Sequence, residues 1–285
     1  MSLPEFLASS PLAFTLCSLL LGLLVGSFLN VVIHRLPIML DRDWRNQSRE
    51  ILDLSAEQQP ERYNLILPNS TCPHCNHKIR ASENIPILSY LFLKGRCSAC
   101  QAPISKRYPL VEVASGLLTA FIAYHFGFGY PAGAFMVLTW GLLAMSMIDV
   151  DRQLLPDAIV LPLLWLGLIV NNFGLFTDLS SALWGAVFGY LSLWLVFWLF
   201  KLATGKEGMG YGDFKLLAML GAWGGWQILP LTVLLSSLVG AVLGVILLKL
   251  RDQATSTPIP FGPYLAIAGW IALLWGQVEL GRIRL

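Results

Sequence analysis

Two aspartates in this chain stand where acid–base chemistry at a membrane edge is possible. Asp213 ends the tetrapeptide Gly210-Tyr-Gly-Asp and begins an apolar stretch, and Asp149 ends another apolar stretch. Gly210 and Gly212 permit unusual dihedral angles or the close approach of a second backbone. A charged side chain at mid-bilayer costs about 3 kcal/mol on insertion scales, so acids placed here indicate function. If the two carboxyl groups meet, the ionised one can activate a water while the protonated one polarises a peptide carbonyl, as in aspartic proteases.

Other charged residues near these aspartates have simpler interpretations. Asp157 opens an expected helix, where its carboxylate can cap the helix and complement the helix dipole. Asp151 suits a solvated loop, and Asp149 taken alone also fits a loop-edge acid. Lys215 points away from Asp213 on a helix and could bind lipid phosphate or orient the loop. Glu112 is either an inward-facing polar contact or a simple interface residue.

Four cysteines form two knuckles of the kind that bind metal. Cys72-Pro-His-Cys75 and Cys97-Ser-Ala-Cys100 are separated by 21 residues, which is close to the spacing of a zinc ribbon. Four thiolates suit tetrahedral Zn²⁺ and leave no open position, so we expect about one structural zinc per chain. The alternatives are a redox-active dithiol pair or four cysteines without a ligand.

The elements that position these residues are membrane helices. The 285 residues are 56% hydrophobic and 13% charged, whereas soluble domains carry about 25% charged residues. The long uncharged runs do not alternate as the strands of a membrane barrel do, and roughly 20 apolar residues span a bilayer as a helix. We therefore predict an all-α polytopic membrane protein with about eight transmembrane helices. The expected spans are 12–34, 110–126, 131–149, 154–176, 179–202, 213–225, 228–250 and 261–278.

Basic residues set the expected orientation of these spans. The polar segment 35–107, inserted between the first and second spans, holds 11 of the 19 Lys and Arg residues. Lys and Arg mark cytoplasmic loops, so we place this segment with its zinc-ribbon-like module in the cytoplasm and the N-terminus in the periplasm. The loops then expected outside carry no Lys or Arg, although Arg282 and Arg284 mildly oppose this orientation. Asp149 and Asp213 both fall at the cytoplasmic face.

Several motifs in the same order along the chain resemble one family. They are 26–37 (GSFLNVVIHRLP), the segment 72–100 with Asn84-Ile-Pro and Gly95-Arg96, 104–109 (ISKRYP), Ile148-Asp149 with Leu155-Pro-Asp157, 210–215 (GYGDFK) and 260–263 (PFGP). The chain resembles the type IV prepilin peptidases, bifunctional leader peptidase/N-methyltransferases of bacterial inner membranes. The resemblance implies a GxGD aspartic protease whose catalytic acids are Asp149 and Asp213. With the expected spans and charges, this divides the chain into a first transmembrane helix (1–34), the cytoplasmic segment (35–107) and a transmembrane peptidase core (108–285).

The resemblance also implies substrates and a second activity. The substrates would be type IV prepilins and type II secretion pseudopilins, cut on the cytoplasmic side after a Gly. The new N-terminal residue, typically Phe, would then be methylated with S-adenosylmethionine. The sequence has no G-x-G-x-x-G after a strand, so the methyltransferase rests on the resemblance alone. We expect its cofactor site near the segment 35–107.

Two alternatives belong to other functional classes. A secondary transporter also places acids at membrane edges, as proton or cation relays, but transporters often show paired repeats. The contexts of Asp149 and Asp213 are dissimilar, and the large loop is not mid-chain. A membrane-anchored zinc-ribbon scaffold is a third option, and it leaves the glycine-flanked Asp213 unexplained.

Overall fold

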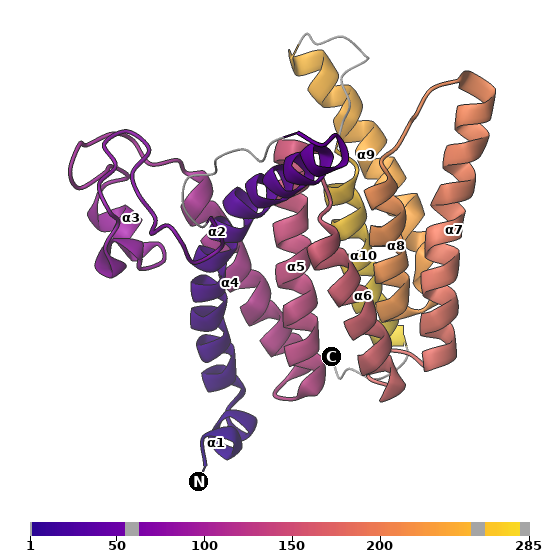
Figure 1. The fold of residues 1–285 in the computed structure, drawn as a ribbon. Coiled ribbons are helices and arrows are strands. Elements are labelled where there is room, and N and C mark those ends of the chain that lie inside the picture. Colours follow the sequence, from indigo (N-terminus) through magenta and orange to yellow (C-terminus); the bar gives the residue numbers. More distant parts are fainter. Residues whose placement is uncertain (1, 55–62, 252–259, 280–285) are drawn as a thin grey trace. The chain divides into compact units, whose positions relative to one another are not determined.

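The computed structural model describes residues 2–54, 63–251 and 260–279, and these residues fold into helices joined by turns (Figure 1). Within these ranges no strand forms, and the β-structure consists of isolated bridges such as Thr71 with Lys78. The all-helical expectation is therefore confirmed. The chain divides into two compact units, Met1–Phe128 and Gly129–Leu285.

Two long helices form the membrane part of the first unit. The elements of this unit are α1 (Leu3–Ser9), α2 (Pro11–Ile51), the 3-10 helix η1 (Ala81–Asn84), α3 (Leu88–Phe92) and α4 (Arg107–Phe126). Helices α2 and α4 pack closely through small residues, the usual means of helix contact in membranes. A Cβ on Gly22 would lie 2.5 Å from Thr119 Oγ1, and one on Gly26 would lie 2.7 Å from Glu112 Cα. Ser115 Oγ donates to the Gly22 carbonyl at 2.6 Å.

Helix α2 extends beyond the span expected over 12–34. It continues through Pro37 to Ile51, and Figure 1 shows it changing direction between its two halves. A proline inside a helix removes one backbone hydrogen bond and commonly causes such a bend. Arg35, expected to mark the membrane edge, is buried; its guanidinium donates to the carbonyls of Asn64 (3.0 Å) and Pro68 (2.6 Å). The polar segment thus begins as helix and folds back onto it.

The second unit surrounds one short buried helix. Its elements are α5 (Tyr130–Arg152), α6 (Asp157–Asn172), α7 (Leu179–Thr204), α8 (Tyr211–Gly224), the 3-10 helix η2 (Trp226–Ile228), α9 (Leu229–Arg251) and α10 (Gly262–Glu279). Helix α8 contacts α6, α7, α9 and α10, and its residues from Asp213 to Trp223 are buried apart from Lys215. A helix that is apolar on nearly every side requires such a covering. A Cβ on Gly185 of α7 would lie 2.3 Å from the Gly221 carbonyl oxygen, so α7 and α8 meet backbone to backbone.

A buried amide fixes the far end of α8. Asn171 Nδ2 donates to the carbonyls of Ala222 (2.8 Å) and Trp223 (2.9 Å), and Asn171 Oδ1 accepts from the backbone N–H groups of Phe176 and Thr177, each at 3.0 Å. These bonds use both donors and both lone pairs of the side-chain amide. They satisfy carbonyls that every helix leaves open at its C-terminus. The opposite end of α8, which carries Asp213, is thereby held in register.

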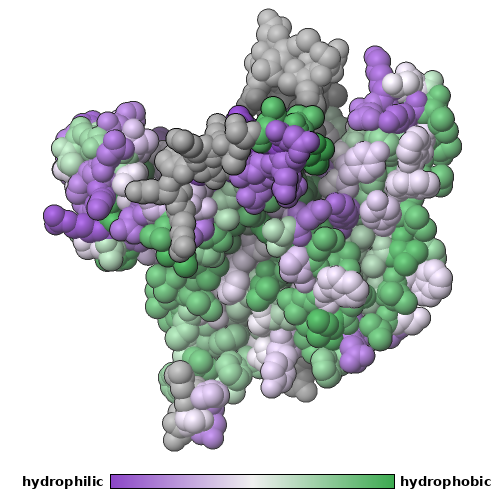
Figure 2. All heavy atoms as spheres, viewed as in Figure 1, coloured by the Kyte–Doolittle hydropathy of each residue, from purple (hydrophilic) through white to green (hydrophobic). Residues whose placement is uncertain are grey.

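Four helices of the described chain are long and apolar enough to cross a membrane: Pro11–Ile51, Arg107–Phe126, Tyr130–Arg152 and Leu179–Thr204. Each of the eight expected spans corresponds to a helix, but α6 (16 residues) and α8 (14 residues) are shorter than the roughly 20 residues of a full span. The count of eight crossings therefore stays a prediction. Figure 2 shows the broad hydrophobic surface over the helices.

Candidate active site and metal centre

The two aspartates singled out in the sequence lie in one site. Asp149 belongs to the last turn of α5 and is 6% exposed; Asp213 belongs to the first turn of α8 and is 7% exposed. Helix α10 packs against both α5 and α8, which brings these two helix ends together. The two carboxyl groups interact electrostatically. Two buried acids that are 64 positions apart in the sequence thus lie in one site.

The start of α8 explains the position of Asp213. Gly210 is the N-cap of this helix, which makes Asp213 its third residue. The Asp213 backbone N–H donates to the Gly210 carbonyl at 3.2 Å, which closes this first turn. The helix dipole favours a negative charge here. The ring of Tyr211 packs on Phe197, with centroids 5.1 Å apart, which anchors this first turn against α7.

The two glycines before Asp213 differ in what they contribute. A Cβ on Gly212 would lie 2.9 Å from Leu155 Cβ, so this position requires the close approach that the sequence predicts. Gly210 has φ −80° and ψ 148°, a conformation open to any residue. Its Cβ would meet the Asp213 Oδ2 only at 3.8 Å, which is an ordinary contact. The backbone conformation therefore does not require a glycine at position 210. The absence of a side chain there leaves the surface next to the Asp213 carboxyl group open.

Gly262 is a site residue to which the sequence analysis assigned no role. Its backbone N–H donates to Asp149 Oδ2 at 3.0 Å, and it is the first residue of α10. A Cβ there would lie 2.7 Å from Asp149 Oδ2 and 3.1 Å from Leu155 Cδ2. The first turn of α10 thus holds the Asp149 carboxylate at a helix N-terminus. The available signal was a glycine between two prolines at the start of an apolar run.

The structure corrects the interpretation of the neighbouring charges. Asp157 lies in the first turn of α6, where its charge complements the helix dipole as expected, but it does not cap the helix, because Pro156 is the N-cap and makes no side-chain bond. Both Asp157 carboxylate oxygens instead accept from Lys215 Nζ, at 2.8 and 2.7 Å. Lys215 therefore ties the start of α6 to α8, on the side away from Asp213. Asp151 lies on α5, which continues to Arg152, so it is a helical residue and not a loop residue.

The four cysteines of the first unit lie together in a cluster that is positioned to bind a metal. Their Sγ atoms all lie within 4.8 Å of one another, with Cys72 to Cys100 at 3.8 Å and Cys75 to Cys97 at 3.9 Å. Zn–S bonds of about 2.3 Å require tetrahedral S···S edges of about 3.8 Å. The donor set and its spacing therefore fit a tetrahedral zinc ion.

Both knuckles use the same local fold. The N–H of Cys72 donates to the His77 carbonyl and that of Cys97 to the Ala102 carbonyl, each at 2.9 Å. The residue after each second cysteine has a positive φ, 57° at Asn76 and 59° at Gln101. Backbone N–H groups of His74 and Cys75 lower the pKa of the Cys72 thiol to about 7, which favours the thiolate that binds metals.

A carboxylate links the two knuckles. Glu83 Oε2 accepts from the Arg80 N–H at 2.8 Å, lies 3.2 Å from His77 Nε2 and is close to Ser98 in the second knuckle. The Arg80 amide is the main reason that the pKa of Glu83 falls to about 2. Because His77 is engaged with Glu83, the four cysteines remain the candidate metal donors. Such outer contacts orient metal ligands.

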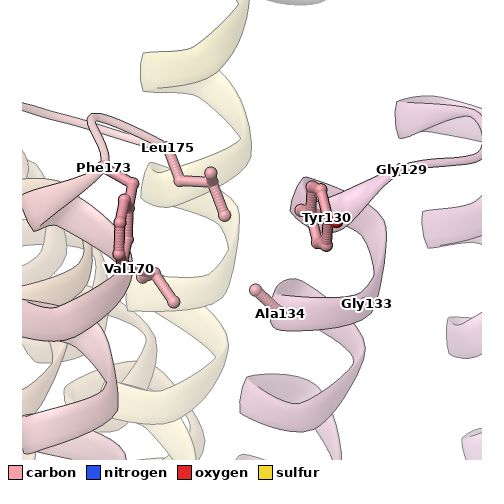
Figure 3. Close-up of a pocket in the computed structure, with 7 residues that line it drawn as sticks. All are labelled: Gly129, Tyr130, Gly133, Ala134, Val170, Phe173 and Leu175. Carbon is pink, nitrogen blue, oxygen red and sulfur yellow. The ribbon is translucent and has the colours of Figure 1, made fainter.

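A separate apolar hollow lies at the other end of α5. It measures about 580 Å³ and is lined by Gly129, Tyr130, Gly133, Ala134, Val170, Phe173 and Leu175 (Figure 3). These residues lie at the start of α5 and at or just after the end of α6, whereas Asp149 belongs to the last turn of α5. The hollow contains no titratable side chain other than the exposed Tyr130, so it does not serve the acid pair.

Known proteins resemble this chain over nearly its full length. Residues 20–126 match the bacterial Peptidase A24 N-terminal domain and residues 136–245 match the type IV leader peptidase family. A prepilin leader peptidase/N-methyltransferase of Stutzerimonas stutzeri is 72% identical over 273 residues, covering 96% of this chain and 94% of the relative. The protein of the same name in Pseudomonas aeruginosa is 71% identical over 277 residues, which cover 97% of this chain and 96% of the relative. The one in Aeromonas hydrophila is 59% identical over 261 residues, which cover 90% of this chain and 89% of the relative.

No solved structure matches the chain. The relatives, by contrast, share well over half of its residues across both units. The chain therefore belongs to the type IV leader peptidase family.

Proposed function

We propose that this protein is an aspartic endopeptidase and N-methyltransferase of the bacterial inner membrane. It removes the leader peptide from type IV prepilins and type II secretion pseudopilins, then methylates the new N-terminal residue, typically Phe, with S-adenosylmethionine. Relatives named for both activities support this proposal, because they cover nearly the whole chain at high identity. Four membrane-capable helices support the location.

The observation that carries the peptidase proposal is the meeting of two buried carboxyl groups, Asp149 and Asp213, at one site. In the proposed reaction one ionised carboxylate accepts a proton from a water. The other, protonated, donates a hydrogen bond to the scissile carbonyl oxygen. The Gly262 amide holds the Asp149 carboxylate in place, and Gly212 lets α8 approach Leu155 closely. Neither a metal nor a covalent intermediate is required for this step.

The membrane topology is also a proposal. The chain crosses eight times, with the N-terminus in the periplasm and the segment 35–107 inserted on the cytoplasmic side between the first helix (1–34) and the peptidase core (108–285). The distribution of Lys and Arg among the loops supports it. Asp149 and Asp213 then lie at cytoplasmic helix ends. A reporter fused at Gly205 should give a cytoplasmic signal, and a periplasmic signal there would refute the orientation.

We propose that Cys72, Cys75, Cys97 and Cys100 hold one structural Zn²⁺ that joins the two knuckles. A closed four-thiolate site stabilises a fold and offers no position for a substrate. The methyl donor is proposed to bind near the segment 35–107. When bound there, S-adenosylmethionine supplies the methyl group to the new N-terminal amine.

Mass spectrometry of a reaction with a prepilin tests both activities. Purified protein is incubated with a prepilin, with and without S-adenosylmethionine. We expect the leader to be lost in both reactions and one methyl group to be gained only with the donor. An uncut prepilin would contradict the peptidase proposal, and a cut but unmethylated product in the complete reaction would contradict the methyltransferase proposal.

A further inference from the structure

The polar segment carries an apolar surface on α3 that the proposed function does not use. Ile85 (47% exposed), Leu88 (51%), Leu91 (64%) and Phe92 (83%) make up what we call the α3 apolar face. The residues that follow it, Lys94 and Arg96, are exposed and basic. Exposed apolar residues grouped in this way mark an interaction site.

A hydrogen bond fixes α3 to the membrane helix α4. The Ile87 N–H, just before α3, donates to Glu112 Oε2 at 2.8 Å. Glu112 is only 8% exposed on α4 and lies beside Ser27 of α2. Ile87 has φ 62°, which is a genuine outlier for a β-branched residue. The bond to Glu112 stabilises this unusual conformation, so the position of α3 is imposed by α4.

The position of Glu112 along α4 indicates how far α3 reaches into the membrane boundary. Glu112 is five residues beyond Arg107, or about 7.5 Å along a helix that rises 1.5 Å per residue. The exposed apolar surface of α4 already begins at Leu110, which is 65% exposed. Figure 1 shows α3 at the height of the N-terminal turns of α4. Amphipathic segments that lie on membranes reach about 5–10 Å into the boundary between headgroups and acyl chains.

We propose that the α3 apolar face docks onto the lipid bilayer, at the headgroup boundary beside α4. Its apolar side chains continue the lipid-facing surface of α4, and Lys94 and Arg96 lie where anionic lipid phosphates attract basic residues. The four-cysteine cluster is then held against the membrane surface. This inference depends on α4 being a membrane helix and is independent of the catalytic roles of Asp149 and Asp213.

Photo-crosslinking in a bilayer tests the docking. The full-length protein with Phe92→p-benzoylphenylalanine is reconstituted into vesicles of phosphatidylethanolamine and phosphatidylglycerol, irradiated, and analysed by mass. The matched control carries the same probe at His74, an exposed aromatic position on the first knuckle. We expect a lipid adduct at position 92 in several-fold higher yield than at position 74. Equal yields at the two positions, or an adduct at position 92 to a second protein chain in place of lipid, would overturn the proposal.

A pair of substitutions at Glu112 tests how α3 is held. In the protein labelled at position 92, Glu112→Ala removes the acceptor of the Ile87 N–H, whereas Glu112→Gln keeps an acceptor oxygen. The lipid adduct should fall several-fold with Glu112→Ala and persist with Glu112→Gln. An adduct undiminished by Glu112→Ala would show that α3 reaches lipid without this bond and would refute the inferred anchor. If Glu112→Ala fails to fold, the comparison of positions 92 and 74 still decides whether the face meets lipid.

Discussion

Replacing Gly262 by alanine should displace the Asp149 carboxylate without changing the charge of the site. The new Cβ would lie 2.7 Å from Asp149 Oδ2 and 3.1 Å from Leu155 Cδ2. Ordinary contact begins at 3.4 Å, so the carboxylate must retreat by about 0.7 Å (3.4 − 2.7). The 3.0 Å bond from the Gly262 N–H to that oxygen would lengthen as a result.

The size of the effect follows from that displacement. A misplacement of about 1 Å in a catalytic group can cost about 10²-fold in rate. For a shift of about 0.7 Å we expect cleavage to slow by about 10- to 100-fold, or about 1.4–2.7 kcal/mol in the activation free energy. Forcing one methyl group into a packed site costs a comparable 1–3 kcal/mol or so.

The assay compares initial rates of leader removal from a prepilin per mole of folded enzyme. Gly276→Ala is the matched control on the same helix, because its Cβ would meet Ile228 Cγ2 at an ordinary 3.7 Å. We expect that control to cleave at the native rate. Equal rates for Gly262→Ala and Gly276→Ala would refute the reasoning that the start of α10 positions Asp149.

Three further predictions test other contacts. Elemental analysis should find roughly one zinc per chain, because four thiolates complete one site; Cys72→Ser should lose most of this zinc, and the control Cys17→Ser should keep it. Undiminished zinc in Cys72→Ser would contradict four-thiolate ligation. Lys215→Ala breaks a partly exposed ion pair and should cost at most about 1 kcal/mol in thermal unfolding with little loss of cleavage; complete loss of cleavage would instead assign Lys215 to the reaction. Gly185→Ala places a Cβ 2.3 Å from a backbone oxygen and should destabilise the folded protein by about 1–3 kcal/mol, whereas the control Gly133→Ala, whose Cβ meets nothing within 4 Å, should not. Equal melting temperatures of the two variants would argue against backbone contact between α7 and α8.

Much of the fold and the site could be predicted because the signals are local. Long apolar runs predict helices, and two Cys-x-x-Cys knuckles predict a shared metal site. The sequence also singled out Asp149 and Asp213, since an acid in an apolar run is costly to bury without a purpose. Their common site could only be inferred through the expected topology, and the structure supplies α10 as the element that packs against both helices.

The features of the site that the sequence did not predict depend on contacts between distant segments. The Gly262 bond to Asp149 joins residues 113 positions apart, and the Lys215 pair with Asp157 joins residues 58 apart. No spacing rule links such positions. The continuation of α2 through Pro37 was missed for a different reason: proline usually ends a helix, but here the helix bends and continues as the start of the polar segment.

We propose that Asp149 and Asp213 together hydrolyse the leader peptide bond. Asn is nearly isosteric with Asp but does not ionise, so it cannot accept a proton from the attacking water or share one with its partner. Leader removal from a prepilin by purified Asp149→Asn and Asp213→Asn, measured by mass spectrometry, tests this claim most directly. We expect each variant to insert into the membrane at the native level and to leave the prepilin uncut. Full cleavage by either variant would exclude that aspartate from the reaction.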